Sequence, residues 1–87
     1  MTVSKSEIIA MVASQSGVDA REVRSVVNAL LGQIETSLIA GEDVSLGGFG
    51  SFGLESPPDP ADENRLRAKA VRVPKFRPGK ALRDHLN

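Results

Sequence analysis

The sequence has no cysteine, no tryptophan and no tyrosine, and its only aromatic residues are Phe49, Phe52 and Phe76. Without cysteine, the chain forms no disulfide, performs no thiol-based redox chemistry and offers no thiolate to a metal ion. A chain without disulfides is typical of a reducing compartment, so we expect a cytoplasmic protein.

Residues suited to catalysis are also scarce. The only histidine is His85, close to the C-terminal end, where a lone histidine is more often solvated than a general base. Glu42 and Asp43 are adjacent on an expected strand and so point to opposite faces. Residues 47–53 (GGFGSFG) lack the strand-to-helix context of a dinucleotide site, and no metal-ligand spacing occurs. We therefore expect no enzymatic activity, cofactor, metal ion or small-molecule substrate.

Long hydrophobic runs are missing too. The first 17 residues contain an apolar patch, but Ser, Glu and Gln interrupt it, which does not fit the core of a signal peptide. No run of apolar residues approaches the length of a membrane span. The sequence therefore predicts a soluble chain with no membrane partner.

Positive charge is scarce in most of the chain, although the net charge is zero. Residues 1–64 carry three cations against ten anions, a balance of minus seven. Residues 65–87 carry eight cations against Asp84 alone, a balance of plus seven. A basic block of this density favours a polyanionic partner such as nucleic acid. The alternative is a solvated basic face that the acidic part of the same chain neutralises.

Two helix-start signals occur in the first half of the chain. Ser4 with Glu7, and Asp19 with Glu22, have the spacing of capping boxes, in which side chains satisfy the free N–H groups of a first turn. Apolar residues of helical period follow each box. Gly17 is placed to end the first helix in a left-handed conformation.

The second helix, which should end at Gly41, carries more apolar surface than the short first helix can cover. Its apolar residues recur at steps of three and four: Val23, Val26, Val27, Leu30, Leu31, Ile34, Leu38 and Ile39. A chain this short buries only about 60 to 65% of its unfolded surface alone, so this stripe predicts burial against another subunit. A helix-turn-helix DNA reader is an alternative, but only Arg21 and Arg24 suit a recognition helix. A helical hairpin that forms a core is preferred.

From residue 42 the pattern changes to short strands. Residues 42–46 alternate polar and apolar, Gly47 and Gly48 predict a tight turn, and Phe49, Ser51 and Phe52 lead into a second strand. Residues 56–64 (SPPDPADEN) contain three prolines and predict a loop. Residues 65–73 (RLRAKAVRV) predict a third strand with one basic face.

Two prolines bound the region that follows. Pro74 should end regular strand pairing, and Pro78 should be the first residue of a last helix that runs from Gly79 to Leu86. The N–H groups at the start of that helix would point outward and favour an anion beside Lys80. The alternative is a group of cations simply exposed around a turn.

Residues 41–46 (GEDVSL), 48–52 (GFGSF) and 73–82 (VPKFRPGKAL), in this order, resemble the bacterial histone-like HU and integration host factor family of DNA-bending proteins. The resemblance covers nearly the whole chain. It implies an α+β fold with two N-terminal helices, a three-stranded antiparallel β-sheet with a β-ribbon arm, and a short C-terminal helix, assembled as an intertwined dimer.

A single domain, residues 1–87, would then have three parts. These are a helical hairpin for dimerisation (1–41), the sheet and arm (42–77) and the C-terminal helix (78–87). The expected partner is double-stranded DNA, bound with low sequence specificity. We expect a homodimer, with a heterodimer with a paralogue as the alternative.

The basic block and the resemblance together mark the candidate residues. The expected DNA-binding residues are Arg65, Arg67, Lys69, Arg72, Lys75, Arg77, Gly79, Lys80, Arg83, Gly48 and Gly50. The expected dimer core consists of Val27, Leu30, Leu31, Ile34, Leu38, Phe49, Phe52 and Phe76.

The arm departs from the family pattern. Only 21 residues separate Phe52 from Pro74, and the acidic residues 56–64 stand where the family has a basic Arg-Asn-Pro tip. We therefore expect an architectural protein of the nucleoid that bends DNA less than typical members do. The alternative is an HU-like dimerisation or protein-interaction module that has lost most of its DNA affinity.

Overall fold

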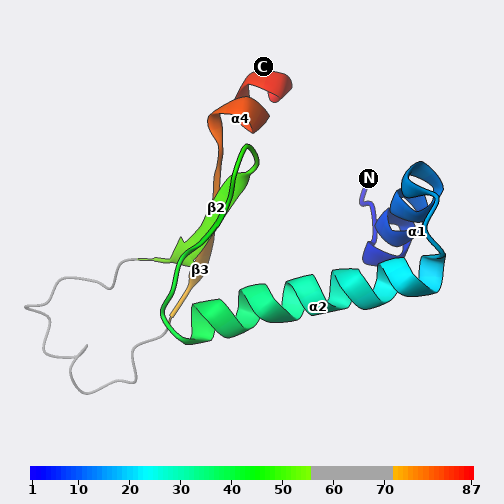
Figure 1. The fold of residues 1–87 in the computed structure, drawn as a ribbon. Coiled ribbons are helices and arrows are strands. Elements are labelled where there is room, and N and C mark those ends of the chain that lie inside the picture. The colour runs from blue at the N-terminus through cyan, green and yellow to red at the C-terminus, as the bar shows by residue number, and fades with distance from the viewer. Residues whose placement is uncertain (56–71) are drawn as a thin grey trace, which may run out of the picture. The chain divides into compact units, whose positions relative to one another are not determined.

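The fold is α+β, as the sequence predicts. The structure, a computed structural model, describes residues 1–55 and 72–87 (Figure 1). Its elements, in chain order, are α1 (Lys5–Ser16), α2 (Ala20–Ile39), β1 (Val44–Leu46), β2 (Gly50–Leu54), β3 (Pro74–Pro78) and α4 (Lys80–Leu86). The chain divides into two compact units, Met1–Glu35 and Thr36–Asn87, which are described separately. None of the described helices is both long and apolar enough to span a membrane.

The first unit holds α1 and the larger part of α2. The Ser4 Oγ accepts a hydrogen bond from the Glu7 N–H at 3.2 Å, and Gly17 ends α1 with φ of 74°, both as predicted. The Asp19 carboxylate caps α2 by accepting from the Arg21 N–H at 2.7 Å, one residue earlier than a capping box requires.

The core of this unit is small. Ile9 and Val23 are the only hydrophobic side chains that are buried in the described part of the chain. The Lys5 Nζ donates to the Asn28 Oδ1 at 2.8 Å and ties α1 to α2 at the surface. The two helices therefore contact each other through few buried groups, and most of the apolar stripe of α2 stays accessible.

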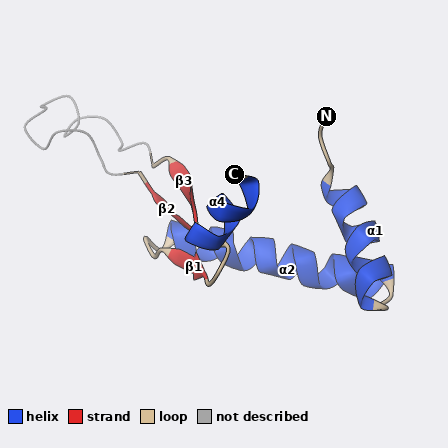
Figure 2. Cartoon of the chain, turned by 90° about the horizontal axis from the view of Figure 1, so that it is seen from above, coloured by secondary structure: helices blue, strands red, loops and turns tan. Residues whose placement is uncertain are grey.

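The second unit is built on an antiparallel sheet in the order β1-β2-β3 (Figure 2). Phe52 pairs with Val44 on one side and with Phe76 on the other. The pairing of β2 with β3 continues past both strand ends, where the Glu55 N–H donates to the Val73 carbonyl and the Gly79 N–H to the Phe49 carbonyl, at 2.7 and 2.8 Å. Because bonded and non-bonded pairs alternate, Pro74, Phe76 and Pro78 occupy the non-bonded positions.

The predicted role of both prolines was wrong. Pro74 begins β3 and Pro78 ends it, and α4 starts at Lys80 with Gly79 as its N-cap. Proline is tolerated here because neither of these positions needs an N–H toward β2, and β3 is an edge strand of the described sheet. The loop predicted for residues 56–64 lies outside the described residues, as does most of the strand predicted for residues 65–73.

One face of this sheet is apolar. The Phe76 ring lies 5.0 Å from the ring of Phe52 and 5.5 Å from that of Phe49, measured between centroids. Gly50 is buried under Phe76, and a Cβ on Gly50 would lie 2.6 Å from the Phe76 Cζ and 2.6 Å from the Arg77 carbonyl oxygen. We call this the aromatic face.

Changing Gly50 to Ala should destabilise the protein, because the added methyl group meets backbone that cannot move without breaking the β2–β3 pairing. Overpacking of this kind costs about 1 to 3 kcal/mol in the free energy of unfolding, which urea denaturation measures. The matched control is Gly47→Ala, where a Cβ would meet no atom within 4 Å. Equal midpoints for both variants would contradict the close contact.

Candidate nucleic-acid interface

The opposite face of the sheet is polar. Side chains alternate between the two faces along each strand, and polar residues occupy the positions between those of the aromatic face. Ser45 pairs with Ser51, Ser51 with Arg77, and Gly53 with Lys75. The flanking carboxylates of Asp43 and Glu55 reach the same surface. A hollow of about 220 Å³ lies here, lined by Asp43, Ser51, Phe52, Gly53, Leu54, Lys75 and Arg77. We call this surface the polar face.

Lys75 has a carboxylate partner on the polar face. Its Nζ lies 3.4 Å from the Glu55 Oε1, and both side chains are about half exposed. Gly53, directly opposite Lys75, leaves room for Asp43, whose Oδ1 would lie 2.9 Å from a Cβ on Gly53. The positive charge of Lys75 is thus partly compensated within the chain.

Arg77 differs from Lys75. It is exposed, and its side chain forms no ion pair or hydrogen bond with another residue of the described ranges. It lines the first hollow and also a second one of about 220 Å³ beside the β1–β2 turn, where Gly48 has φ of 81°. A planar guanidinium at such a position is suited to bidentate binding of an anionic group such as phosphate.

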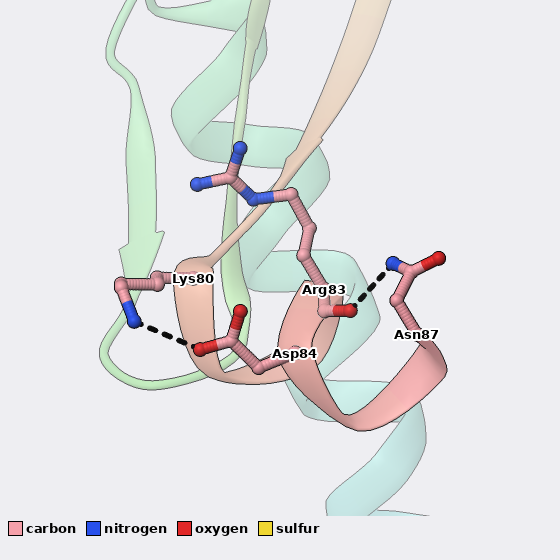
Figure 3. Close-up of polar contacts among 4 residues, drawn as sticks. All are labelled: Lys80, Arg83, Asp84 and Asn87. Carbon is pink, nitrogen blue, oxygen red and sulfur yellow. Dashed lines mark hydrogen bonds and ion pairs between the residues drawn. The ribbon is translucent and has the colours of Figure 1, made fainter.

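The cations of α4 show the same contrast (Figure 3). The Lys80 Nζ lies 2.8 Å from the Asp84 Oδ2, one helical turn away, in an exposed ion pair. The Arg83 guanidinium points away from that pair, and its side chain bonds to no other described residue, although its carbonyl accepts from the Asn87 Nδ2 at 2.8 Å. Arg83 is therefore the cation of α4 available to an external anion.

The anion seat predicted at the start of the last helix has lost one of its N–H groups. The Gly79 N–H is already bonded to the Phe49 carbonyl, so it is not free for an anion. Lys80 has Asp84 as its counter-ion. Gly79 serves the packing instead, since a Cβ on it would lie 3.1 Å from the Phe49 carbonyl oxygen.

The remaining predicted DNA-binding residues are spread over different settings. Gly50 lies under the aromatic face rather than on the polar face, and Gly48 forms the β1–β2 turn. The Arg72 Nη1 donates to the Ile39 carbonyl at 2.8 Å, at the end of α2. Arg65, Arg67 and Lys69 lie outside the described residues.

The predicted dimer-core residues are incompletely covered within one chain. Leu30, Leu31, Phe49 and Phe76 are 49, 47, 49 and 40% exposed. The other four, Val27, Ile34, Leu38 and Phe52, are half-buried. Side chains of this size and apolarity remain available for a partner.

Sequence reasoning missed the acidic residues of the site. The spacing of four between Lys80 and Asp84 on a helix was the available signal for their ion pair. Glu55 and Lys75 are 20 positions apart, and only the register of β2 with β3 brings them together.

Comparisons with known proteins agree with this fold. Residues 3–87 match the family described as "Bacterial DNA-binding protein". The DNA-binding protein HU of Thermus thermophilus is 34% identical over 88 residues, covering 95% of this chain and 91% of that protein. Integration host factor subunit beta of Shewanella amazonensis is 37% identical over 90 residues, covering 97 and 95%.

Solved structures give the same result. HU from Thermotoga maritima superposes with a TM-score of 0.76 at 32% identity, covering 98% of this chain and all of that one. The HU chain of an Anabaena HU–DNA cocrystal structure gives a TM-score of 0.77 at 28% identity, with 97% of each chain covered. The fold, the expected family and the absence of an enzymatic role are thereby confirmed. The chain belongs to the HU and integration host factor family of bacterial DNA-binding proteins.

Proposed function

We propose that this protein binds double-stranded DNA with little sequence preference, as a dimeric architectural protein of the bacterial nucleoid. The observation that carries the proposal is the pair of exposed arginines, Arg77 on the polar face and Arg83 on α4, with no counter-ion among the described residues. Family membership and the similarity to an HU chain solved with DNA support it.

The chemistry of the polar face favours phosphate over base recognition. Its described groups are two cations, two serine hydroxyls and two carboxylates on a short strand surface. Such groups contact the sugar-phosphate backbone and position a protein on DNA without reading the base sequence. Low sequence preference follows.

A dimer is proposed because one chain alone buries too little. Of the hydrophobic side chains in residues 1–55 and 72–87, only Ile9 and Val23 are buried, whereas Leu30, Phe49 and Phe76 expose 40 to 49% of their surface. A second copy that covers the stripe of α2 and the aromatic face would supply the missing core.

Sedimentation equilibrium should give the mass of two chains. A monomer that gains mass only when a paralogue is added would favour the heterodimer.

Duplex binding should depend steeply on salt. The four cations of the polar face and α4, Lys75, Arg77, Lys80 and Arg83, make eight in a dimer, and the unpaired arginines Arg77 and Arg83 make four. The slope of log K against log salt should lie at about −4 to −7, a loss of roughly 10² to 10⁴ in affinity between about 50 and 200 mM salt. Fluorescence anisotropy with a duplex of about 30 base pairs measures it. No binding at micromolar dimer in low salt would refute the proposal.

We further propose that bending is weaker than in typical family members. The support comes from sequence alone: 21 residues between Phe52 and Pro74, with Asp59, Asp62 and Glu63 near the middle. An acidic segment is repelled by phosphates and makes an ineffective wedge in a minor groove. Energy transfer between the ends of a labelled duplex should change little on binding, and a sharp approach of the ends would contradict this.

A second candidate function is a dimerisation or protein-interaction module with little DNA affinity. The observation that favours it is the pairing of Lys75 and Lys80 with Glu55 and Asp84, which leaves two of the five described candidate cations compensated. The same anisotropy titration separates the two functions, because a module of this kind remains dimeric but does not bind the duplex.

A further inference from the structure

The polar face carries as many described anions as cations. Lys75 and Arg77 contribute two positive charges, and Asp43 and Glu55 contribute two negative charges, so the balance is zero. A surface that only had to attract phosphates would gain nothing from carboxylates beside its cations. Their placement therefore needs a separate physical explanation.

Glu55 contacts Lys75, and Asp43 lies near it on the polar face. Glu55 follows β2 and its Oε1 lies 3.4 Å from the Lys75 Nζ. Asp43 precedes β1 and sits over Gly53, the residue directly opposite Lys75 on β2. Asp43, Lys75 and Arg77 also line one hollow. Arg77 lies two residues after Lys75 on β3 and pairs with Ser51. Its side chain contacts no carboxylate among the described residues.

We propose that Glu55, assisted by Asp43, is a negative determinant of nucleic-acid affinity, a competitor that holds Lys75 until a phosphate displaces it. This inference rests on the proposed function, because it concerns the same surface. Arg77 then supplies the permanent anion contact of the polar face, and Lys75 supplies a conditional one.

Glu55 acts on a bound phosphate in two ways. An exposed ion pair contributes little net free energy, so a phosphate is able to replace Glu55. After displacement, the freed carboxylate stays close to the phosphate and repels it through a partly solvated medium. Both effects lower affinity without abolishing binding. A dimer contains two copies of the Glu55–Lys75 pair, one in each subunit.

The test is Glu55→Gln in the full-length protein, titrated with a duplex of about 30 base pairs at fixed salt. Affinity should rise roughly tenfold, because two lysines per dimer are released and two repulsive charges are removed. The slope against salt should steepen by up to about 2. Asp43→Asn should raise affinity less.

The matched control is Glu35→Gln, which makes the same charge change on an exposed position of α2. An equal gain in both glutamine variants would show a general charge effect and overturn the inference. Binding by the wild type with no gain in Glu55→Gln would also overturn it. Absence of binding by all variants, each a folded dimer, would instead refute the proposed function.

A double-mutant cycle makes the test independent of any change in stability. Lys75→Gln should cost less than about threefold in affinity in the wild type, where Glu55 already occupies the lysine, but roughly tenfold in the Glu55→Gln background. If Lys75→Gln lowers affinity equally in the two backgrounds, Glu55 does not compete with phosphate for Lys75.

Discussion

Replacing Arg77 and Arg83 together with glutamine should lower the affinity for a duplex of about 30 base pairs roughly a hundredfold at about 100 mM salt. The two guanidinium groups are exposed and have no counter-ion among the described residues, so they reach phosphates at no internal cost. A dimer loses four contacts. The slope of log K against log salt should therefore become shallower by about 3 to 4.

The matched control is Arg21→Gln with Arg24→Gln, which removes the same charge from the first turns of α2. Both arginines are exposed and lie in the other compact unit. Non-specific attraction by net charge alone would weaken binding equally in the two double variants. That result would contradict the assignment of the polar face and α4 as the DNA-binding surface.

Changing Phe76 to Ala should cost about 3 to 5 kcal/mol per subunit in the free energy of unfolding, if the dimer buries its ring. Phe76 is the centre of the aromatic face: its ring contacts Phe49 and Phe52 and covers Gly50. Denaturation at several protein concentrations measures the cost. The wild-type midpoint should rise with concentration, since folding and association are coupled.

The size of the effect separates a dimer from a lone chain. Within one chain Phe76 remains 40% exposed. Its truncation there would remove only about 1 to 2 kcal/mol of transfer free energy. A small cost together with a midpoint that does not depend on concentration would contradict the dimer. Phe76→Leu, which keeps an apolar side chain, is the control and should retain most of the stability.

Local signals predicted the helices well. The start of α1 depends on Ser4 and its end on Gly17, and each acts through contacts within one helical turn. Such contacts are encoded by residues three or four positions apart and need no knowledge of the rest of the fold.

The prolines of β3 were misjudged because their effect depends on register. A proline interrupts a strand only where its missing N–H would have bonded to the neighbouring strand. Pro74 and Pro78 both fall on the positions that point away from β2, and this follows from the bonds at Glu55 and Gly79. Which residues of β3 direct their N–H groups toward β2 is set by strand pairing, and the local sequence does not specify that pairing.

The charged site was predicted only in part for the same reason. The sequence indicated where the cations are, and Arg77 and Arg83 are exposed as expected. It did not indicate that Glu55 would reach Lys75, because the partner of a side chain on one strand depends on how two distant segments align.

Contact of DNA phosphates with the polar face and α4 is measured directly by nuclear magnetic resonance of the arginine Nε–Hε groups. Unlabelled duplex is added to ¹⁵N-labelled protein under conditions where anisotropy reports binding. The signals of Arg77 and Arg83 should shift while those of Arg21 and Arg24 stay in place. Shifts confined to Arg21 and Arg24, or no shift at Arg77 and Arg83 in the bound state, would contradict it.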